Sequence, residues 1–113
     1  MDNCLFCKIA AGEIPSNKVY EDDKILSFRD IDPQAPMHVL VIPKDHISSA
    51  AAVDHDNSGV VAHIFEVMGP LAAELGLEDG FRVVSNVGAQ GGQTVPHLHF
   101  HLLGGRDLTW PPG

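Results

Sequence analysis

The sequence predicts a single domain that combines β-strands with helices, and three observations lead to that fold class. Its 113 residues can bury one hydrophobic core but are too few for two. Residues 97–102 alternate histidine with an apolar residue, and residues 38–43 form the continuous apolar run of a central strand. Residues 60–75 instead repeat apolar side chains at spacings of three and four, which is the period of a helix.

The first half of the chain is predicted to hold short elements. Residues 5–11 are compatible with a short helix that places both cysteines on its first turn. Residues 19–21 and 24–29 are predicted strands, joined by a tight turn at Asp22-Asp23. A proline-fixed loop at residues 31–36 then leads into the predicted central strand.

The second half is predicted to hold one long helix and two further strands. Residues 47–53 could form a short helical segment, after which Asp54 or Asp56 can cap the long helix. Pro70 falls inside this helix, where it predicts a bend or a neighbour that tolerates the missing donor. His55 and His63 are expected to be solvated near its exposed side. The apolar stripe of the helix comprises Val60, Ile64, Val67, Met68, Leu71 and Leu75. Residues 81–86 are a predicted strand, and a glycine-rich hairpin separates it from the histidine strand.

Composition excludes several classes of function. Hydrophobic residues make up 44% of the chain, but no apolar run has membrane-spanning length and no signal-like segment opens it. These features predict a soluble, cytoplasmic protein without a membrane partner. The net charge is −8 with histidines neutral, and no cluster of Lys or Arg could neutralise a nucleic-acid polymer. A phosphate-bearing ligand would therefore be small and held locally.

The row of His97, His99 and His101 is the feature with the strongest chemical meaning. Side chains at alternate positions of a strand share a face, so these imidazoles would line one face while the intervening apolar residues pack on the other. Two functions suit such a row: a metal site, or a nucleophile flanked by residues that orient it. The unperturbed pKa of imidazole lies near neutrality, which suits either role.

A Cys-x-x-Cys pair at Cys4 and Cys7 offers the first half of a metal site. This spacing serves zinc, a redox dithiol or a strained short-loop disulfide, and zinc is favoured because only three residues precede the motif. His46 follows the central strand and His97 begins the histidine strand, so both could complete a closed structural zinc site.

That allocation leaves His99 in the middle of the row as the candidate nucleophile. A neutral imidazole can attack phosphorus and form a phosphoramidate intermediate, which divides one difficult displacement into two easier ones. His101 would flank it, and so would His38, which is expected on the adjacent strand. Backbone amides near residues 92–94 and the Thr94 hydroxyl would stabilise charge on the phosphoryl oxygens.

Four stretches of the chain resemble the histidine triad family of nucleotide hydrolases and transferases. The resemblance covers essentially the whole chain and is closest to the small nucleotide-binding branch of purine nucleoside phosphoramidases. Because transferase relatives carry Gln at the third position of the triad, His101 favours hydrolysis. The stretches are residues 4–15, with Cys-Leu-Phe-Cys, residues 28–46, with Phe-Arg-Asp-Ile-Asp-Pro-Gln-Ala-Pro-Met-His, residues 91–101, with Gly-Gly-Gln-Thr-Val-Pro-His-Leu-His-Phe-His, and residues 110–113, Trp-Pro-Pro-Gly.

The resemblance implies an α+β fold in which a single domain, residues 1–113, has an antiparallel sheet of about five strands, one long helix and one or two short ones. It implies a homodimer that cleaves the P–N or a related bond at the α-phosphate of purine nucleoside phosphoramidates. A dinucleoside polyphosphate hydrolase and a non-catalytic nucleotide-binding interaction protein are the alternatives.

The resemblance also assigns roles to individual positions. His99 corresponds to the nucleotidylated residue, with His101 and His38 as its supporting histidines, and Asp30 would accept hydrogen bonds from the ribose. In members that have the Cys-x-x-Cys, the cysteines bind zinc with histidines placed like His46 and His97. The remaining substrate-binding positions are Phe28 and Ile31 around the base, Asn86, Gly92, Gln93 and Thr94 around the phosphate, and Trp110 in a tail that reaches the partner's site.

Overall fold

Five strands form one antiparallel sheet in the computed structural model, which describes residues 3–113. The strand β3 (Met37–Pro43) lies in the middle, as its apolar run predicts. In spatial order the sheet comprises β1 (Lys18–Glu21), β2 (Ile25–Arg29), β3, β5 (Phe100–Gly104) and β4 (Phe81–Val84). The predicted α+β fold class is confirmed.

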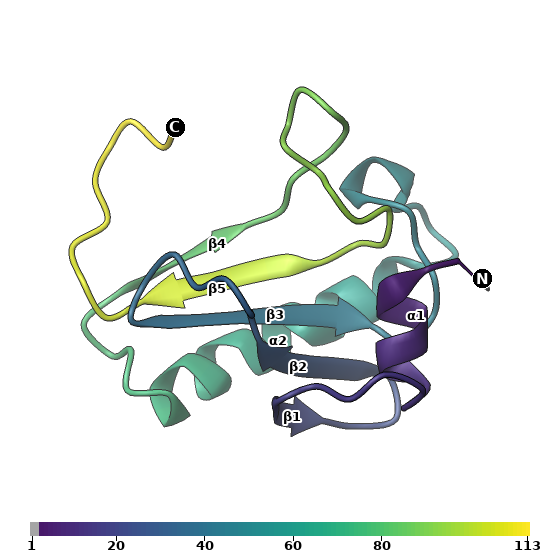
Figure 1. Cartoon of the computed structure of the whole chain (residues 1–113), viewed down its shortest axis with the longest axis horizontal. Coiled ribbons are helices and arrows are strands. Elements are labelled where there is room, and N and C mark those ends of the chain that lie inside the picture. The colour runs from purple at the N-terminus through teal and green to yellow at the C-terminus, as the bar shows by residue number, and fades with distance from the viewer. Residues whose placement is uncertain (1–2) are drawn as a thin grey trace.

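The long helix α2 (Ser58–Glu74) covers one face of this sheet (Figure 1). Three of its four buried residues come from the predicted stripe and the fourth is Ala72, and they pack on the strand residues that point to the same side. Burial of this apolar surface is the main favourable term in folding. The cluster includes Ile64, Met68 and Leu71 from the helix and Ile25, Val39, Val41, Phe100 and Leu102 from the strands.

The short helix α1 (Leu5–Ala10) packs on the opposite face, at the end of the sheet where β3 finishes (Figure 1). The C-terminal tail leaves the sheet at the other end. Strands β2 and β3 are therefore buried on both faces. The second cluster comprises Cys4, Phe6 and Ile9 together with Leu26, Phe28, Leu40 and Ile42.

The start of α2 differs from the prediction. The helix begins after Asn57, whose side chain makes no capping hydrogen bond, so neither Asp54 nor Asp56 is the cap. Asp54 instead accepts hydrogen bonds from the amides of Asp56 and Asn57 through Oδ1 and builds the turn before the helix. The helix continues through Pro70, and the short segment before it is a 3₁₀ turn, η1 (Ala50–Ala52). Among residues 3–113, no helix combines the length and apolar character needed to cross a bilayer.

The histidine strand is shorter than its alternating pattern predicts. Strand β5 begins at Phe100, so only His101 of the three histidines lies within it. The preceding backbone is bonded elsewhere: the Leu98 amide donates to Ile47 O, and the Ser85 hydroxyl donates to His99 O. The alternation of faces nevertheless holds, because Leu98 packs on the α2 side while His97 and His99 contact Phe6 from α1.

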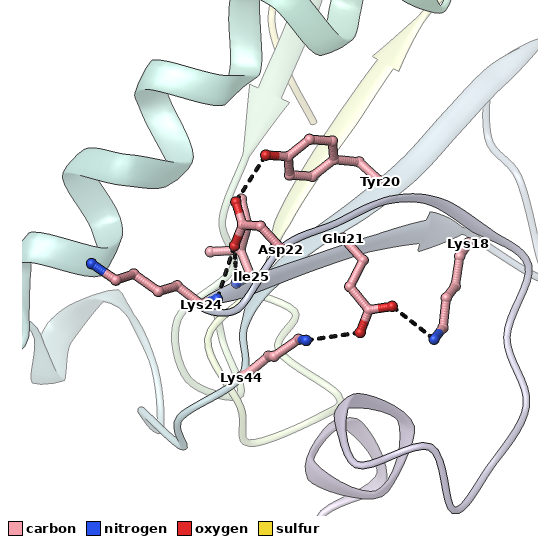
Figure 2. Close-up of polar contacts among 7 residues, drawn as sticks. All are labelled: Lys18, Tyr20, Glu21, Asp22, Lys24, Ile25 and Lys44. Atoms are coloured by element: carbon pink, nitrogen blue, oxygen red, sulfur yellow. Dashed lines mark hydrogen bonds and ion pairs between the residues drawn. The ribbon is translucent and has the colours of Figure 1, made fainter.

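The β1–β2 hairpin is closed by a dense set of polar contacts around Asp22 (Figure 2). Its carboxylate accepts hydrogen bonds from the Tyr20 hydroxyl at 2.8 Å and from the Lys24 and Ile25 amides at 2.8 and 2.9 Å. His63 of α2 adds a contact of 2.6 Å to the same carboxylate. His63 is therefore not merely solvated, as the sequence suggested, but joins the long helix to the hairpin.

Candidate active site and metal centre

The three predicted catalytic histidines lie together on the α1 side of the sheet. His101 is paired with Leu40 in the register of β3 and β5, which places it beside His38 on the neighbouring strand. The two imidazoles are joined by a contact of 2.9 Å between His38 Nε2 and His101 Nδ1. The His99 ring lies 5.1 Å from the His101 ring. The structure thus brings His38, His99 and His101 into one cluster.

The hydrogen bond of His99 sets its tautomer. Its Nδ1 lies 2.7 Å from the carbonyl oxygen of His97. Because a carbonyl can only accept, Nδ1 carries the proton and Nε2 of the neutral ring keeps its lone pair. Phe6 packs its ring against that of His99 at 5.0 Å and an interplanar angle of 89°. His99 is therefore a buried imidazole with a fixed orientation, and the lone pair of its neutral form is on Nε2.

A chain of hydrogen bonds sets the tautomers of the other two histidines. The Gln34 amide donates to His38 Nδ1 at 3.0 Å, so the proton of neutral His38 is on Nε2. That N–H donates to His101 Nδ1, and His101 must then carry its own proton on Nε2. His101 can accordingly offer an N–H donor to a ligand, while His99 offers a lone pair.

Burial keeps this pair of histidines neutral at physiological pH. Burial, followed by the nearby His99 and His38, lowers the pKa of His101 to about 4. Burial also lowers the pKa of His38, and the carboxylates of Asp30 and Asp32 oppose that shift without reversing it. The two neutral histidines can therefore pass on a proton or donate a hydrogen bond without carrying a fixed positive charge.

The predicted ribose and base residues differ widely in their surroundings. Asp30 Oδ2 lies 3.4 Å from His38 Nε2, and its Oδ1 accepts from the Asp32 amide. Phe28 is buried against Phe6, whereas Ile31 is fully exposed. Asp30 thus directly contacts the histidine cluster.

Trp110 lies in the tail and is 80% exposed. The tail is held by Arg82, whose Nη2 donates to the carbonyl of Thr109 at 2.8 Å. The tail leaves the sheet at the end opposite α1 (Figure 1).

The glycine-rich loop presents fewer free amides than the sequence suggested. The Gly92 and Gln93 amides donate to Ala89 O and Gly88 O within the loop. Within residues 3–113, the Thr94 amide has no hydrogen-bond partner and remains available for a ligand. The expectation of a cradle of amides over residues 92–94 is therefore corrected to a single free amide.

Two side chains hold the glycine-rich loop in place by donating hydrogen bonds to backbone carbonyls. Asn86 donates to Gly91 O at 2.8 Å, and Gln93 Nε2 donates to Ser48 O at 2.8 Å. A Cβ at Gly91 would collide with the Val87 carbonyl, and Gly92 has φ of +81°, so glycine is required at both positions. Asn86 and Gln93 shape the loop through its backbone.

The predicted zinc ligands form a compact cluster beside α1, with their ligand atoms all within 4.8 Å of one another. Cys4 Sγ and Cys7 Sγ lie 3.2 and 3.5 Å from His97 Nδ1, and Cys7 Sγ lies 3.3 Å from His46 Nδ1. Tetrahedral zinc with ordinary bond lengths separates sulfur from nitrogen by about 3.5 Å. His97 Nε2–H donates to Pro43 O at 2.9 Å, which leaves Nδ1 unprotonated toward the thiols. The donor set and its geometry therefore fit zinc.

The chemistry of the Cys4 and Cys7 thiols also favours the binding of a cation. Burial raises the pKa of the Cys7 thiol, and the adjacent Cys4 raises it further. Each thiolate would be stabilised by a shared dication, which displaces the thiol protons on binding. Without a cation, the Cys7 thiol would remain mostly protonated at neutral pH.

Asp30, His38 and His101 also group closely enough to hold an ion. Their hydrogen bonds argue against it, because a ligating nitrogen must offer a lone pair. His38 Nε2 is held protonated by the Gln34 amide on Nδ1, and turning that proton to Nδ1 would set two donors face to face. In this tautomer, His38 Nε2 has no lone pair to offer to a metal ion.

Sequence reasoning missed two contributors to the site. Phe6 packs against both His97 and His99, and its place between two candidate zinc ligands was the available signal. The Gln34 amide could not have been found, since every residue except proline carries one and only the folded loop aims it at His38.

An antiparallel sheet with three clustered histidines on its α1 face defines the class of protein. The HIT domain family model matches residues 11–108, and this chain belongs to that family. A HIT family hydrolase from Legionella pneumophila is 57% identical, with a TM-score of 0.95, over 98% of this chain and 100% of that chain.

Two plant relatives match over nearly the whole chain as well. The 14 kDa zinc-binding protein of Zea mays is 50% identical over 96% of this chain and 87% of its own length. The adenylylsulfatase HINT1 of Arabidopsis thaliana is 45% identical over 96% of this chain and 76% of its own length.

Proposed function

We propose that this HIT family chain is a nucleotide hydrolase that cleaves the P–N bond at the α-phosphate of purine nucleoside phosphoramidates through a nucleotidyl-histidine intermediate. The observation that carries the proposal is the hydrogen bond from His99 Nδ1–H to the His97 carbonyl. It leaves Nε2 unprotonated, as a nucleophile requires. The hydrolase name of the Legionella relative supports the reaction class.

In the proposed reaction, the lone pair of His99 Nε2 attacks the α-phosphorus and forms a new P–N bond. The bond from phosphorus to the leaving amine breaks, and the amine takes up a proton from solvent as it departs. Water then attacks phosphorus and gives up a proton to solvent, the bond to His99 breaks, and the nucleoside monophosphate and neutral imidazole are released. His101 donates its Nε2–H to a phosphoryl oxygen, and His38 holds His101 in the tautomer that can do so.

Substrate binding is proposed to use the surroundings of the cluster. Asp30 would accept hydrogen bonds from the ribose hydroxyls, and Phe28 and Ile31 would contact the base. The free Thr94 amide and hydroxyl would bind a phosphoryl oxygen. Asn86, Gly92 and Gln93 would act by shaping the loop that presents Thr94.

A substrate panel distinguishes this proposal from its alternatives. Purified enzyme is assayed with a fluorogenic adenosine phosphoramidate, a diadenosine polyphosphate and adenylyl sulfate, the last because of the Arabidopsis relative's name. The proposal expects the highest kcat/KM for the phosphoramidate. Preference for the dinucleotide or adenylyl sulfate would mean that the enzyme expels a different leaving group by the same nucleotidyl-histidine mechanism. Nucleotide binding without turnover of any substrate would indicate an interaction protein and contradict the proposal.

We also propose that Cys4, Cys7, His46 and His97 bind one structural zinc. The cluster geometry and the name of the Zea mays relative support this ligand set. Protein purified without chelator should contain about one zinc per chain by elemental analysis. The Cys4→Ala, Cys7→Ala double variant should lose it, and unchanged zinc content in that variant would rule out the assignment.

We further propose that residues 1–113 form one HIT domain that acts in the cytoplasm as a homodimer. Exposed apolar side chains support association, with Trp110 at 80%, Phe65 at 52% and Phe81 at 42% exposure. In a dimer, the tail could reach the partner's site rather than its own. Sedimentation should give a dimer at micromolar concentration, and a monomer there would contradict this proposal.

A further inference from the structure

We propose that Arg106 is a positioning residue, whose guanidinium anchors the β2–β3 loop so that the Gln34 amide keeps His38 in its Nε2–H tautomer. The catalytic meaning of this inference rests on the proposed function. The tautomer itself is a property of the unliganded protein and is measured without turnover.

The loop between β2 and β3 has little hydrophobic anchoring of its own. Residues 31–34 are all exposed, and neither of the two core clusters includes them. Two short-range hydrogen bonds shape the loop, from the Asp32 amide to Asp30 Oδ1 and from Gln34 Nε2 to Asp32 O. These bonds set its local turn, but they do not fix the loop relative to the neighbouring strands.

Arg106 supplies a contact from outside the loop. Its Nη2 donates to the Gln34 carbonyl at 2.9 Å, and its Nη1 donates to the Asp107 carbonyl at 3.0 Å. Charge-assisted hydrogen bonds of this kind are stronger than neutral ones. The segment after β5 also lies directly against the loop, because a Cβ on Gly105 would stand 3.0 Å from Pro36 Cβ.

The same residue that receives Arg106 also orients His38. The Gln34 carbonyl accepts from Arg106, while the Gln34 amide donates to His38 Nδ1 at 3.0 Å. The two peptide groups that flank the Gln34 Cα are therefore both restrained. Loss of the Arg106 contact frees one of them, and the amide can then turn away from the imidazole.

Loss of the amide would change the direction of the His38–His101 hydrogen bond. With Nδ1 no longer held as an acceptor, His38 can place its proton there and present a lone pair at Nε2. His101 must then donate from Nδ1, which leaves a lone pair at the nitrogen that faces the phosphoryl oxygens. That state repels the ligand that the other tautomer binds.

The test is ¹⁵N nuclear magnetic resonance of histidine-labelled, zinc-loaded protein without nucleotide. In the unsubstituted protein, His38 should show the Nε2–H tautomer alone. Arg106→Gln should add the Nδ1–H tautomer, and Arg106→Lys, which keeps a charged donor, should largely preserve the original state. Arg82→Gln is the matched control for the tautomer, because it removes an equally charged guanidinium that donates to Leu108 and Thr109 instead.

Kinetics provide the second measurement. If the competent tautomer falls to between half and a tenth of the population, kcat for the phosphoramidate should fall about twofold to tenfold in Arg106→Gln. An unchanged His38 tautomer in folded Arg106→Gln and Arg106→Ala would overturn the inference, whatever the activity. A tautomer shift in a protein that hydrolyses no nucleotide would leave the inference standing and reject the proposed function.

Discussion

Two histidine–carboxylate pairs in this molecule share their residue types but differ in every other respect. His38 Nε2 lies 3.4 Å from Asp30 Oδ2, and the His38 side chain is only 3% exposed. The same nitrogen also contacts His101 Nδ1. His63 lies 2.6 Å from Asp22 with a side chain 31% exposed, and the carboxylate also accepts from three other donors (Figure 2). The His38–Asp30 pair still has donors and acceptors that a ligand could use. The His63–Asp22 pair instead makes its hydrogen bonds within the protein.

The electrostatics of the pairs follow the same division. Burial works against the charged form of Asp22, but the His63, Lys24, Ile25 and Tyr20 hydrogen bonds outweigh it and hold the pKa of this carboxyl well below its usual range. Burial instead lowers the pKa of His38 and keeps that imidazole neutral. The environment, rather than the residue pair, separates a candidate catalytic group from a structural clamp.

The largest expected effect is loss of activity at the histidine cluster. His99→Ala removes the attacking nitrogen, so kcat and kcat/KM for the phosphoramidate should both fall at least about a thousandfold. Nucleotide binding should persist. His55→Ala is the matched control, since His55 is exposed outside the cluster. Near-normal turnover by His99→Ala would show that His99 is not the nucleophile.

The structural pair should show the opposite behaviour. Asp22→Ala removes a charged acceptor of four hydrogen bonds, so the free energy of unfolding should fall by about 2 kcal/mol with activity per folded molecule unchanged. Asp23→Ala, on an exposed neighbour in the same turn, should have little effect. Chemical denaturation of both variants measures the difference.

The pH dependence of that difference follows from the lowered pKa of Asp22. A depressed carboxyl pKa contributes stability that is present above the unfolded value, near 3.8, and is lost as the pH falls toward the folded value. The stability gap between the original chain and Asp22→Ala should therefore shrink below about pH 4. A gap that widened on acidification would contradict the clamp.

A smaller effect should appear in the titration of the buried pair. The pKa of His101 is lowered to about 4, so its imidazole should remain neutral through pH 5 in nuclear magnetic resonance titrations. The unfolded chain protonates from about 6.5 downward, so this histidine makes the fold less stable as the pH falls from 6.5 toward 4. A titration midpoint of His101 near pH 6.5 would show that solvent reaches the cluster more than its burial indicates.

Much of the fold was predictable because periodicity reports burial directly. The stripe of α2 and the apolar run of β3 each bury one continuous surface, so local pattern and tertiary structure agree. The start of β5 was misplaced because the His97–His99 backbone bonds to distant segments, such as Ile47. Side-chain spacing contains no information about those partners.

The candidate site shows the same limit. Residue types indicated the histidine cluster and the Cys/His cluster, since few other patterns combine these groups. Tautomers depend on which backbone group faces each nitrogen, so the His97 carbonyl and the Gln34 amide emerged only from the fold. The clamp at Asp22 was missed because His63 meets it across 41 residues of sequence.

The smallest expected effect concerns Ser27, whose hydroxyl is fully buried in β2 and has no hydrogen-bond partner among residues 3–113. An unsatisfied buried hydroxyl costs stability, so Ser27→Ala should leave the free energy of unfolding unchanged or raise it by about 1 kcal/mol. Activity should be unaffected. A clear loss of stability would mean that this hydroxyl makes a stabilising hydrogen bond in solution.

The most direct measurement of the central claim is the identity of the nucleotidylated residue. Enzyme mixed with an adenosine phosphoramidate is quenched at alkaline pH within the first turnover, because phosphorylated histidine nitrogen is labile in acid. Peptide mass spectrometry should then find the adenylyl group on His99 and no adduct in His99→Ala. An adduct on His97 or His101, or steady turnover with no adduct at any time, would contradict the account.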